Sequence, residues 1–182
     1  MDDLFSTELK ELIAKSREVA LSLGYDYIST IHFFIADCDI NRQTAIMNFA
    51  FSDYNEFTAF KKGYTLQKTD FFDFTDESLP LTKEAEEVIG MLESERIFYK
   101  QTEVFPCHFF IAALKNKNSL LFECYKHDEH ALDNLITYYK TLGAFEKSKM
   151  SEEQIAKEYY MPNIKNKSGF FSRMSKIFKK GK

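Results

Sequence analysis

The sequence predicts an all-α protein built from two pseudo-symmetric four-helix repeats, followed by a basic amphipathic C-terminal tail. The pentapeptide HFFIA occurs at residues 32–36 and again at 108–112, an offset of 108 − 32 = 76 positions. The same offset aligns Leu9 and Leu12 with Ala85 and Val88 without a gap. Strand-like alternation of apolar and polar residues is scarce. Repetition of this length is typical of two copies of one module that bury their apolar faces together.

The first repeat, about residues 4–62, is expected to contain four helices that start at residues able to cap them. Ser6 or Thr7 can cap the first, and Gly24 ends it as a C-terminal glycine. Ser29 and Thr30 offer caps for a short helix that carries the first HFFIA. This helix is apolar nearly all round, so we expect it to be buried. The other two are expected over about 44–51 and from Asp53 to about Lys62.

The second repeat, about residues 81–143, follows the same plan. Thr82 opens a helix to about Tyr99, and Pro106 suits the first turn of the helix with the second HFFIA. A third helix is expected over 119–125, and Asp128 is expected to cap a last helix ending near Gly143. The two repeats and their linker form one predicted domain, 1–145, and residues 146–182 form a C-terminal extension.

The linker between the repeats, residues 63–80, carries an acidic aromatic strip at 70–77. Its aromatic and acidic members are Phe71, Phe72, Phe74, Asp70, Asp73 and Asp76. In one interpretation the phenylalanines pack back onto the helices, because exposed apolar clusters are uncommon. In the other, the strip is a contact surface for a basic, apolar partner segment. Both interpretations stay open at this point.

The basic tail, residues 163–182, has seven basic residues and no acidic one, so the preceding residues carry −4 − 7 = −11. Five apolar residues would share one face of a helix here, with cations mainly on the other: Phe170, Phe171, Met174, Ile177 and Phe178 against Arg173, Lys176, Lys179 and Lys180. Three interpretations are open. The tail packs on the acidic body, folds into a partner's groove, or attaches to an anionic membrane surface.

The net charge, the cysteine content and the lack of long apolar runs limit the classes of function. An acidic body argues against nucleic acid as a partner, because phosphate contacts need a basic face. Cys38, Cys107 and Cys124 are widely spaced and do not resemble a disulfide framework. The sequence shows no secretory signal and no apolar run of about 18 residues that could cross a membrane. We therefore expect a cytoplasmic protein.

No set of residues predicts catalysis, a cofactor or a metal. His32 and His108 each precede three apolar residues on a predicted core helix, so we interpret them as hydrogen-bonded structural histidines. Cys124, His127 and His130 have a spacing that differs from known zinc sites. No phosphate-binding G-x-x-x-x-G-K-[ST] loop is present, so we expect neither ATP binding nor unfoldase activity. We expect a protein that is not an enzyme.

The repeated motif resembles the double-repeat N-terminal domain of the Clp unfoldases. The residues that carry the resemblance are 29–34 (STIHFF), 105–110 (FPCHFF) and the helix end at 21–25 (LSLGY), and the likeness covers about 4–143. It implies a freestanding module that receives proteins or peptides. Its partners would be a Clp-type ATPase, a substrate of one, or a sheath subunit of a type VI secretion machine. Ile31 and Cys107 replace the acidic residue that the family often has before the motif histidine, which argues against recognition of phosphorylated arginine.

Overall fold

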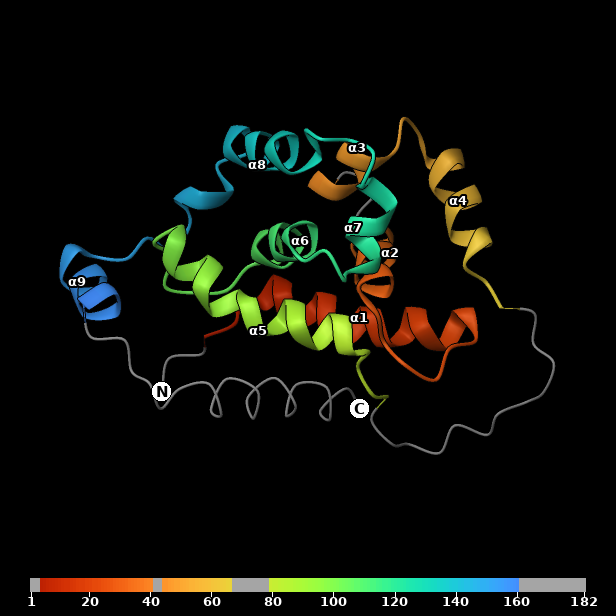
Figure 1. The fold of residues 1–182 in the computed structure, drawn as a ribbon, viewed down its shortest axis with the longest axis horizontal. Helices are drawn as coiled ribbons and strands as arrows, with labels where there is room; N and C mark the ends of the chain where they lie inside the picture. The colour runs from red at the N-terminus through yellow and green to blue at the C-terminus, as the bar shows by residue number, and fades with distance from the viewer. Residues whose placement is uncertain (1–3, 41–43, 67–78, 161–182) are drawn as a thin grey trace.

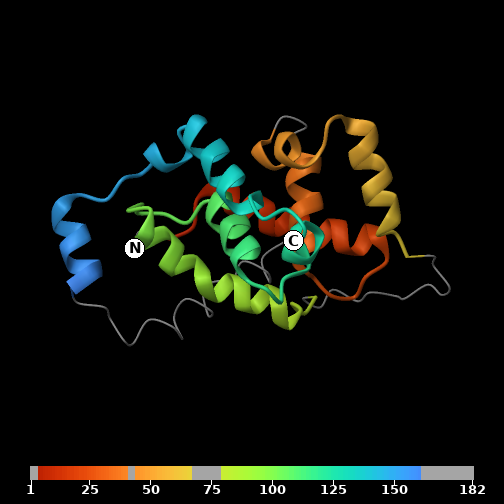
Figure 2. The ribbon, with the colours of Figure 1, turned by 45° about the horizontal axis from the view of Figure 1, so that its top comes forward.

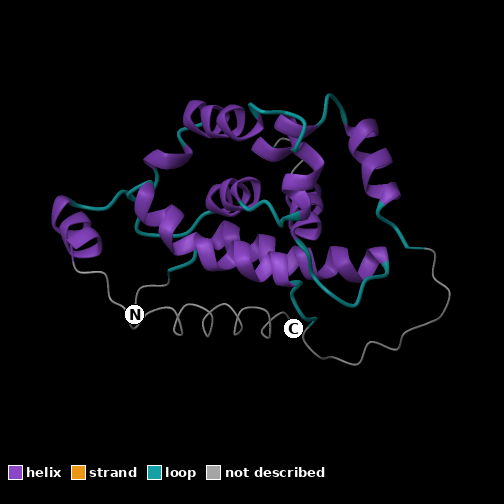
Figure 3. Cartoon of the chain, viewed as in Figure 1, coloured by secondary structure: helices purple, strands orange, loops and turns teal. Residues whose placement is uncertain are grey.

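The computed structural model describes residues 4–40, 44–66 and 79–160, and these are mostly helical, without a β-strand in the described ranges (Figures 1 and 3). The all-α prediction is confirmed. Within the described residues, each helix is too short or too polar to span a bilayer. The α-helices are α1 Thr7–Leu23, α2 Thr30–Ile40, α3 Ala45–Ala50, α4 Tyr54–Gly63, α5 Lys83–Phe98, α6 Pro106–Lys115, α7 Leu120–Tyr125, α8 Ala131–Thr141 and α9 Glu152–Tyr160, with a 3₁₀ turn, η1, at Ala144–Glu146.

Most helix starts lie where the capping residues predict. The Ser6 hydroxyl accepts a hydrogen bond from the Leu9 N–H at 3.1 Å and so satisfies one free donor of the first turn of α1. Gly24 ends α1 with φ at 91°, a left-handed conformation that glycine adopts without steric cost. The start of α8 was predicted wrongly. It begins at Ala131 after His130, because Asp128 accepts a hydrogen bond from the His130 N–H in the preceding turn instead of capping the helix.

The two HFFIA helices, α2 and α6, are the buried helices of the fold, as predicted. Phe33, Phe34, Phe109 and Phe110 are each at most 1% exposed. The rings of Phe33 and Phe109 stack with their centroids 4.3 Å apart, which joins α2 to α6 directly. Around them, α1 packs on α2 and α5 packs on α6, while α8 covers the other side of α6 (Figures 1 and 2).

Two short backbone pairings connect the segments that precede the helices. Phe5, before α1, pairs with Val104, before α6, and Ile28, before α2, pairs with Leu81, before α5. In the first pairing, the Val104 N–H donates to the Leu4 carbonyl at 2.8 Å, and the Ser6 N–H donates to the Val104 carbonyl at 3.1 Å. Because 81 − 5 and 104 − 28 both equal 76, the two pairings join corresponding residues in exchanged order.

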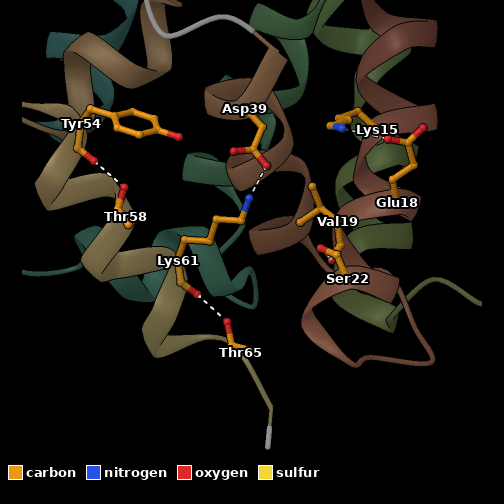
Figure 4. A network of polar contacts seen from close by, with 9 residues as sticks. All are labelled: Lys15, Glu18, Val19, Ser22, Asp39, Tyr54, Thr58, Lys61 and Thr65. Atoms are coloured by element: carbon orange, nitrogen blue, oxygen red, sulfur yellow. Dashed lines mark hydrogen bonds and ion pairs between the residues drawn. The ribbon is translucent and has the colours of Figure 1, made fainter. Parts of the chain in front are cut away.

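Helix α4 lies at one edge of the molecule, next to α2 (Figure 1). Its single fully buried side chain among those described is Phe57. Lys61 of α4 forms an ion pair with Asp39 of α2 (Figure 4). Phe60 adds an edge-to-face contact with Phe34 at 5.5 Å between ring centroids. These contacts fix the carboxyl end of α4 against α2.

The start of the C-terminal extension packs against the opposite end of the molecule. The Gln101 side-chain amide donates to the carbonyls of Ala144 and Lys147, at 3.1 and 2.9 Å. Arg96 of α5, only 3% exposed, pairs with Glu158 of α9 at 3.4 Å. Helix α9 was not among the expected helices. It lies in the extension before the basic tail.

We predict that Phe110→Ala lowers the free energy of unfolding by about 3–5 kcal/mol, since it removes a fully buried ring and leaves a cavity. Phe34→Ala should have a similar cost. Chemical denaturation measures both. Phe98→Ala serves as the control because Phe98 is 65% exposed and should change stability by less than about 1 kcal/mol. Losses as small as the control's at both core positions would contradict the packing of the two repeated motifs.

Candidate functional site: an acidic cavity beside the start of α6

The residues first considered for partner binding lie outside the described residues. The acidic aromatic strip falls within 67–78, and the basic tail falls within 161–182. Their assignment as contact surfaces therefore stays a prediction. The candidate site described below is therefore built from other side chains, which the structure does describe.

The two motif histidines cap the helices on which they lie. The Ser29 N–H donates to His32 Nδ1, and the Phe105 N–H donates to His108 Nδ1, both at 2.9 Å. The hydrogen bonding predicted for these histidines is confirmed. Burial lowers the pKa of His32 to about 4, and burial together with nearby Arg96 lowers the pKa of His108 to about 3. Both imidazoles are therefore neutral at pH 7.

The cysteines and the Cys124–His130 segment offer no evident chemistry. Among the described residues, no three His, Cys, Asp or Glu side chains gather closely enough to hold a metal ion. Burial raises the pKa of Cys107 to about 12, so its thiol is protonated at neutral pH and is a poor nucleophile.

A partly open cavity of about 280 Å³ lies where α1 and α6 begin and α2 ends. Three carboxyl groups line it, those of Glu8, Glu11 and Asp37. Glu8 and Glu11 are exposed on α1 at the mouth, whereas Asp37 on α2 is half-buried. Apolar groups form much of the rest of the wall, including Ile40 and Phe105. The cavity thus combines carboxylates with apolar surface, an arrangement typical of ligand pockets.

Asp37 is the deepest of the three carboxyl groups. Its side chain is hydrogen-bonded to Thr44, which precedes α3. Burial raises the pKa of Asp37 to about 6, because the ionised carboxylate loses hydration there. Burial also raises the pKa of the Tyr139 phenol on α8, and Asp37 contributes to this shift. The inner wall of the cavity is therefore polar, and its acid ionises near neutral pH.

The cavity has a closed counterpart elsewhere in the structure. Glu84 occupies the position that corresponds to Glu8, since 84 − 8 = 76, and its carboxylate accepts from the Thr30 N–H at 2.9 Å and from the Thr82 hydroxyl at 2.8 Å. The Thr30 hydroxyl donates to its second oxygen at 2.7 Å. The position that corresponds to Thr30 is Pro106, which has neither an N–H nor a hydroxyl group. The two Thr30 donors are therefore missing at the cavity, whereas Ser6, which corresponds to Thr82, still forms a hydrogen bond with Glu8.

The second carboxylate shows the same difference. Glu87 accepts hydrogen bonds from the side-chain amides of Asn116 and Asn118, at 3.2 and 3.0 Å. Its corresponding residue, Glu11, accepts no hydrogen bond from the described part of the chain. Where the counterpart has Asn116, the cavity has Ile40, since 116 − 40 = 76. Among the described residues, the carboxylate of Glu11 therefore lacks the amide donors that Glu87 has.

One cation stands at the mouth of the cavity among its described lining residues. Lys147 Nζ lies 3.5 Å from Glu8 and 5.8 Å from the centre of the Phe105 ring. Both side chains of this ion pair are more than half exposed, so the pair is weak and easily exchanged. With Asp37 ionised, the lining residues that the structure describes carry three negative charges and one positive charge.

The fold and this cavity define an all-α protein with an acidic, partly apolar pocket at its surface. No family model matches the chain, and no curated protein matches it. Function is therefore inferred from the cavity and from the repeated motif. Such a cavity can hold a group that supplies N–H donors and positive charge. Among its described lining residues, none is a nucleophile activated by a neighbouring base.

Sequence reasoning did not select Glu8, Glu11 or Asp37 as candidate site residues. The internal repeat nevertheless contained a signal that could have identified the cavity. Aligning the chain with itself at the offset of 76 replaces Thr30 by Pro106, which removes two donors from one copy only. When one copy of an internal repeat has lost a hydrogen-bond donor that the other copy keeps, the carboxylate in the first copy lacks that donor.

We predict that His32 and His108 make the protein acid-sensitive. Each has a lowered pKa in the folded state, so its contribution to stability is present above pH 6.5 and is lost as the pH falls towards 4. The free energy of unfolding should fall by up to about 2 kcal/mol per histidine between pH 7 and pH 4.5. The stability of His108→Asn should vary less with pH. Exposed His127→Asn is the control, and equal pH dependence in wild type and His108→Asn would contradict the prediction.

We predict the opposite dependence for Asp37. Its pKa rises from 3.8 in the unfolded chain to about 6, so the stability it contributes is present below pH 3.8 and is lost as the pH rises through 6. Asp37→Asn should therefore gain about 1–2 kcal/mol over wild type at pH 8 relative to pH 4. Denaturation at both pH values measures the change. Exposed Asp26→Asn is the control. A gain that is independent of pH would show that Asp37 is not buried as a carboxylic acid.

Proposed function

We propose that this protein is a non-enzymatic module that binds a protein or peptide and resembles the substrate- and adaptor-receiving domain of the Clp unfoldases. Two pseudo-symmetric repeats, about 4–62 and 81–143, are part of the proposal. The exchanged backbone pairings of Phe5 with Val104 and of Ile28 with Leu81 support it, because a twofold relation between repeats requires such an exchange. The stacking of Phe33 on Phe109 supports it too, since corresponding residues meet only near a twofold axis.

The observation that carries the proposal is the unequal state of the two corresponding sites. One is filled by the protein's own donors around Glu84, and the other is a cavity with Glu8 and Glu11 at its mouth. A carboxylate that lacks its internal donor can take one from a partner. The two capping histidines and the protonated thiol of Cys107 support binding rather than catalysis.

The proposed role is that of a freestanding adaptor or assembly partner. Its partner would be a Clp-type ATPase, a substrate of such an ATPase, or a sheath subunit of a secretion machine. In the alternative role, the basic tail at 163–182 attaches the protein to an anionic membrane surface. The two roles differ in what the isolated chain binds, which one capture experiment can separate.

The test places the photo-crosslinking residue p-benzoylphenylalanine at Ile40, which lines the cavity and is 44% exposed, in the full chain expressed in its own cells. The same residue at Phe98, 65% exposed and outside the cavity lining, is the control. We expect one protein adduct from position 40 that is absent from position 98. Adducts shared by both positions, or no protein adduct at all, would contradict the proposal. Sedimentation of the full chain with anionic vesicles would then favour the membrane role.

A further inference from the structure

The second repeat has a buried cation where the first repeat has a small apolar residue. Arg96 on α5 is 3% exposed, and its corresponding residue is Ala20 on α1, since 96 − 76 = 20. Ala20 is fully buried, so a methyl group is enough to pack this position of the helix. The fold itself therefore does not require a charge there. Because a buried cation is costly unless acceptors compensate it, the groups that accept from Arg96 indicate its role.

The carboxylate that compensates Arg96 comes from α9, outside the two repeats. Arg96 Nη1 donates to the Gln101 carbonyl at 3.0 Å, and Nη2 donates to Glu158 Oε1 at 3.4 Å. The Glu158 side chain is 40% exposed. Arg96 Nε is buried and has no hydrogen-bond partner in the described part of the chain. A guanidinium group can hold a carboxylate by two parallel hydrogen bonds, so Glu158 uses only part of what this site offers.

Helix α9 is short and has its own cap. The Ser151 hydroxyl accepts from the Gln154 N–H at 3.2 Å, and Gln154 Oε1 accepts from the Ser151 N–H at 2.8 Å. Of the α9 side chains that the structure describes, Ile155 and Glu158 are half-buried and the others are exposed. These two lie three residues apart, on one face of the helix. Helix α9 contacts α5 at the outer end of the molecule (Figures 1 and 2). A helix with so small a buried face opens at low cost.

The segment before α9 is held independently of it. The Met150 N–H donates to the Lys100 carbonyl at 2.8 Å, and the Thr102 N–H donates to the Ser148 carbonyl at 2.7 Å. Met150 is itself buried. These bonds fix the chain up to residue 150 against the loop that follows α5. Helix α9 can therefore leave α5 without breaking them.

We propose that Arg96 anchors a docking site for an acidic helix of a partner protein, and that α9 occupies this site in the isolated chain. The partner helix would place a carboxylate on Arg96 and an apolar side chain three residues earlier, as α9 places Glu158 and Ile155. Charge complementarity selects this partner, because α9 itself carries three glutamates and one lysine. A basic or wholly apolar helix would leave the cation of Arg96 without a carboxylate, which is unfavourable.

This inference goes beyond the proposed function, because it concerns another surface. Neither Arg96 nor α9 lines the cavity beside the start of α6. Opening of α9 and binding of a partner are coupled by competition for one cation. A partner helix with a better placed carboxylate would displace α9, and α9 would in turn exclude weaker ligands.

The probe is a synthetic peptide of residues 150–160, blocked at both ends, titrated into the ¹⁵N-labelled full chain and followed by NMR. The receiving chain carries Glu158→Lys, which places a second cation beside Arg96 and so releases α9. We expect the peptide to shift the amide signals of Arg96 and its neighbours on α5. Its affinity should be about tenfold higher than for the wild type, in which the tethered α9 competes. Glu152→Lys, the same change at an exposed residue of α9, is the control and should behave as the wild type does.

The contact is also tested from both sides. A peptide with lysine in place of Glu158 should bind the Glu158→Lys chain about tenfold more weakly than the original peptide. Adding Arg96→Ala to that chain should remove binding of the original peptide. This variant is expected to fold, because Ala20 occupies the corresponding position, and thermal melting checks it. If it does not fold, the comparison of the two peptides still decides.

Three results would overturn the inference: no shift with the peptide in the Glu158→Lys chain, equal binding of the two peptides, or equal affinity of the wild type and Glu158→Lys for the peptide. The test is separable from that of the proposed function. A protein adduct from position 40 neither requires nor produces peptide binding at Arg96. Failure of either test therefore leaves the other proposal standing.

Discussion

The contact between Phe33 and Phe109 is the constraint on which the rest of the structure depends. These two rings lie on α2 and α6, the most apolar helices of the chain, and both are fully buried. Burying two such helices removes a large apolar area from water, which is the main driving force of folding. It also requires amphipathic helices on the outside, and α1, α5 and α8 supply them. The positions of α1, α5 and α8 follow from covering this pair.

The capping histidines of the same motif satisfy backbone donors at the starts of the two buried helices. A helix buried at its start leaves backbone N–H groups without water, and an unsatisfied donor there is costly. His32 and His108 accept such bonds from the backbone N–H of the residue that immediately precedes their own helix. The acceptor nitrogen must stay unprotonated, and burial keeps the imidazole neutral by lowering its pKa. The repeated histidine is thus part of the structural solution, next to the phenylalanines that fill the core.

The cavity arises because the two copies of this plan differ at a few positions. Thr30 and its counterpart Pro106 start equivalent helices, yet only threonine can hold a carboxylate. Asn116 and Ile40 differ in the same way for the second carboxylate. The apolar core tolerates these exchanges because they lie at the ends of the helices and not at the contact between Phe33 and Phe109. Such places can acquire a binding function without loss of the fold.

The sequence by itself determined the helical class, most helix starts and the burial of the HFFIA motifs, because caps and apolar periodicity act over a few residues. It failed at Asp128, where two polar residues competed to start α8, and it did not indicate α9. Only the tertiary structure brought Glu11 of α1 and Asp37 of α2 to one cavity, together with Lys147 from the C-terminal extension. Such proximity depends on how helices pack, and no local pattern encodes it.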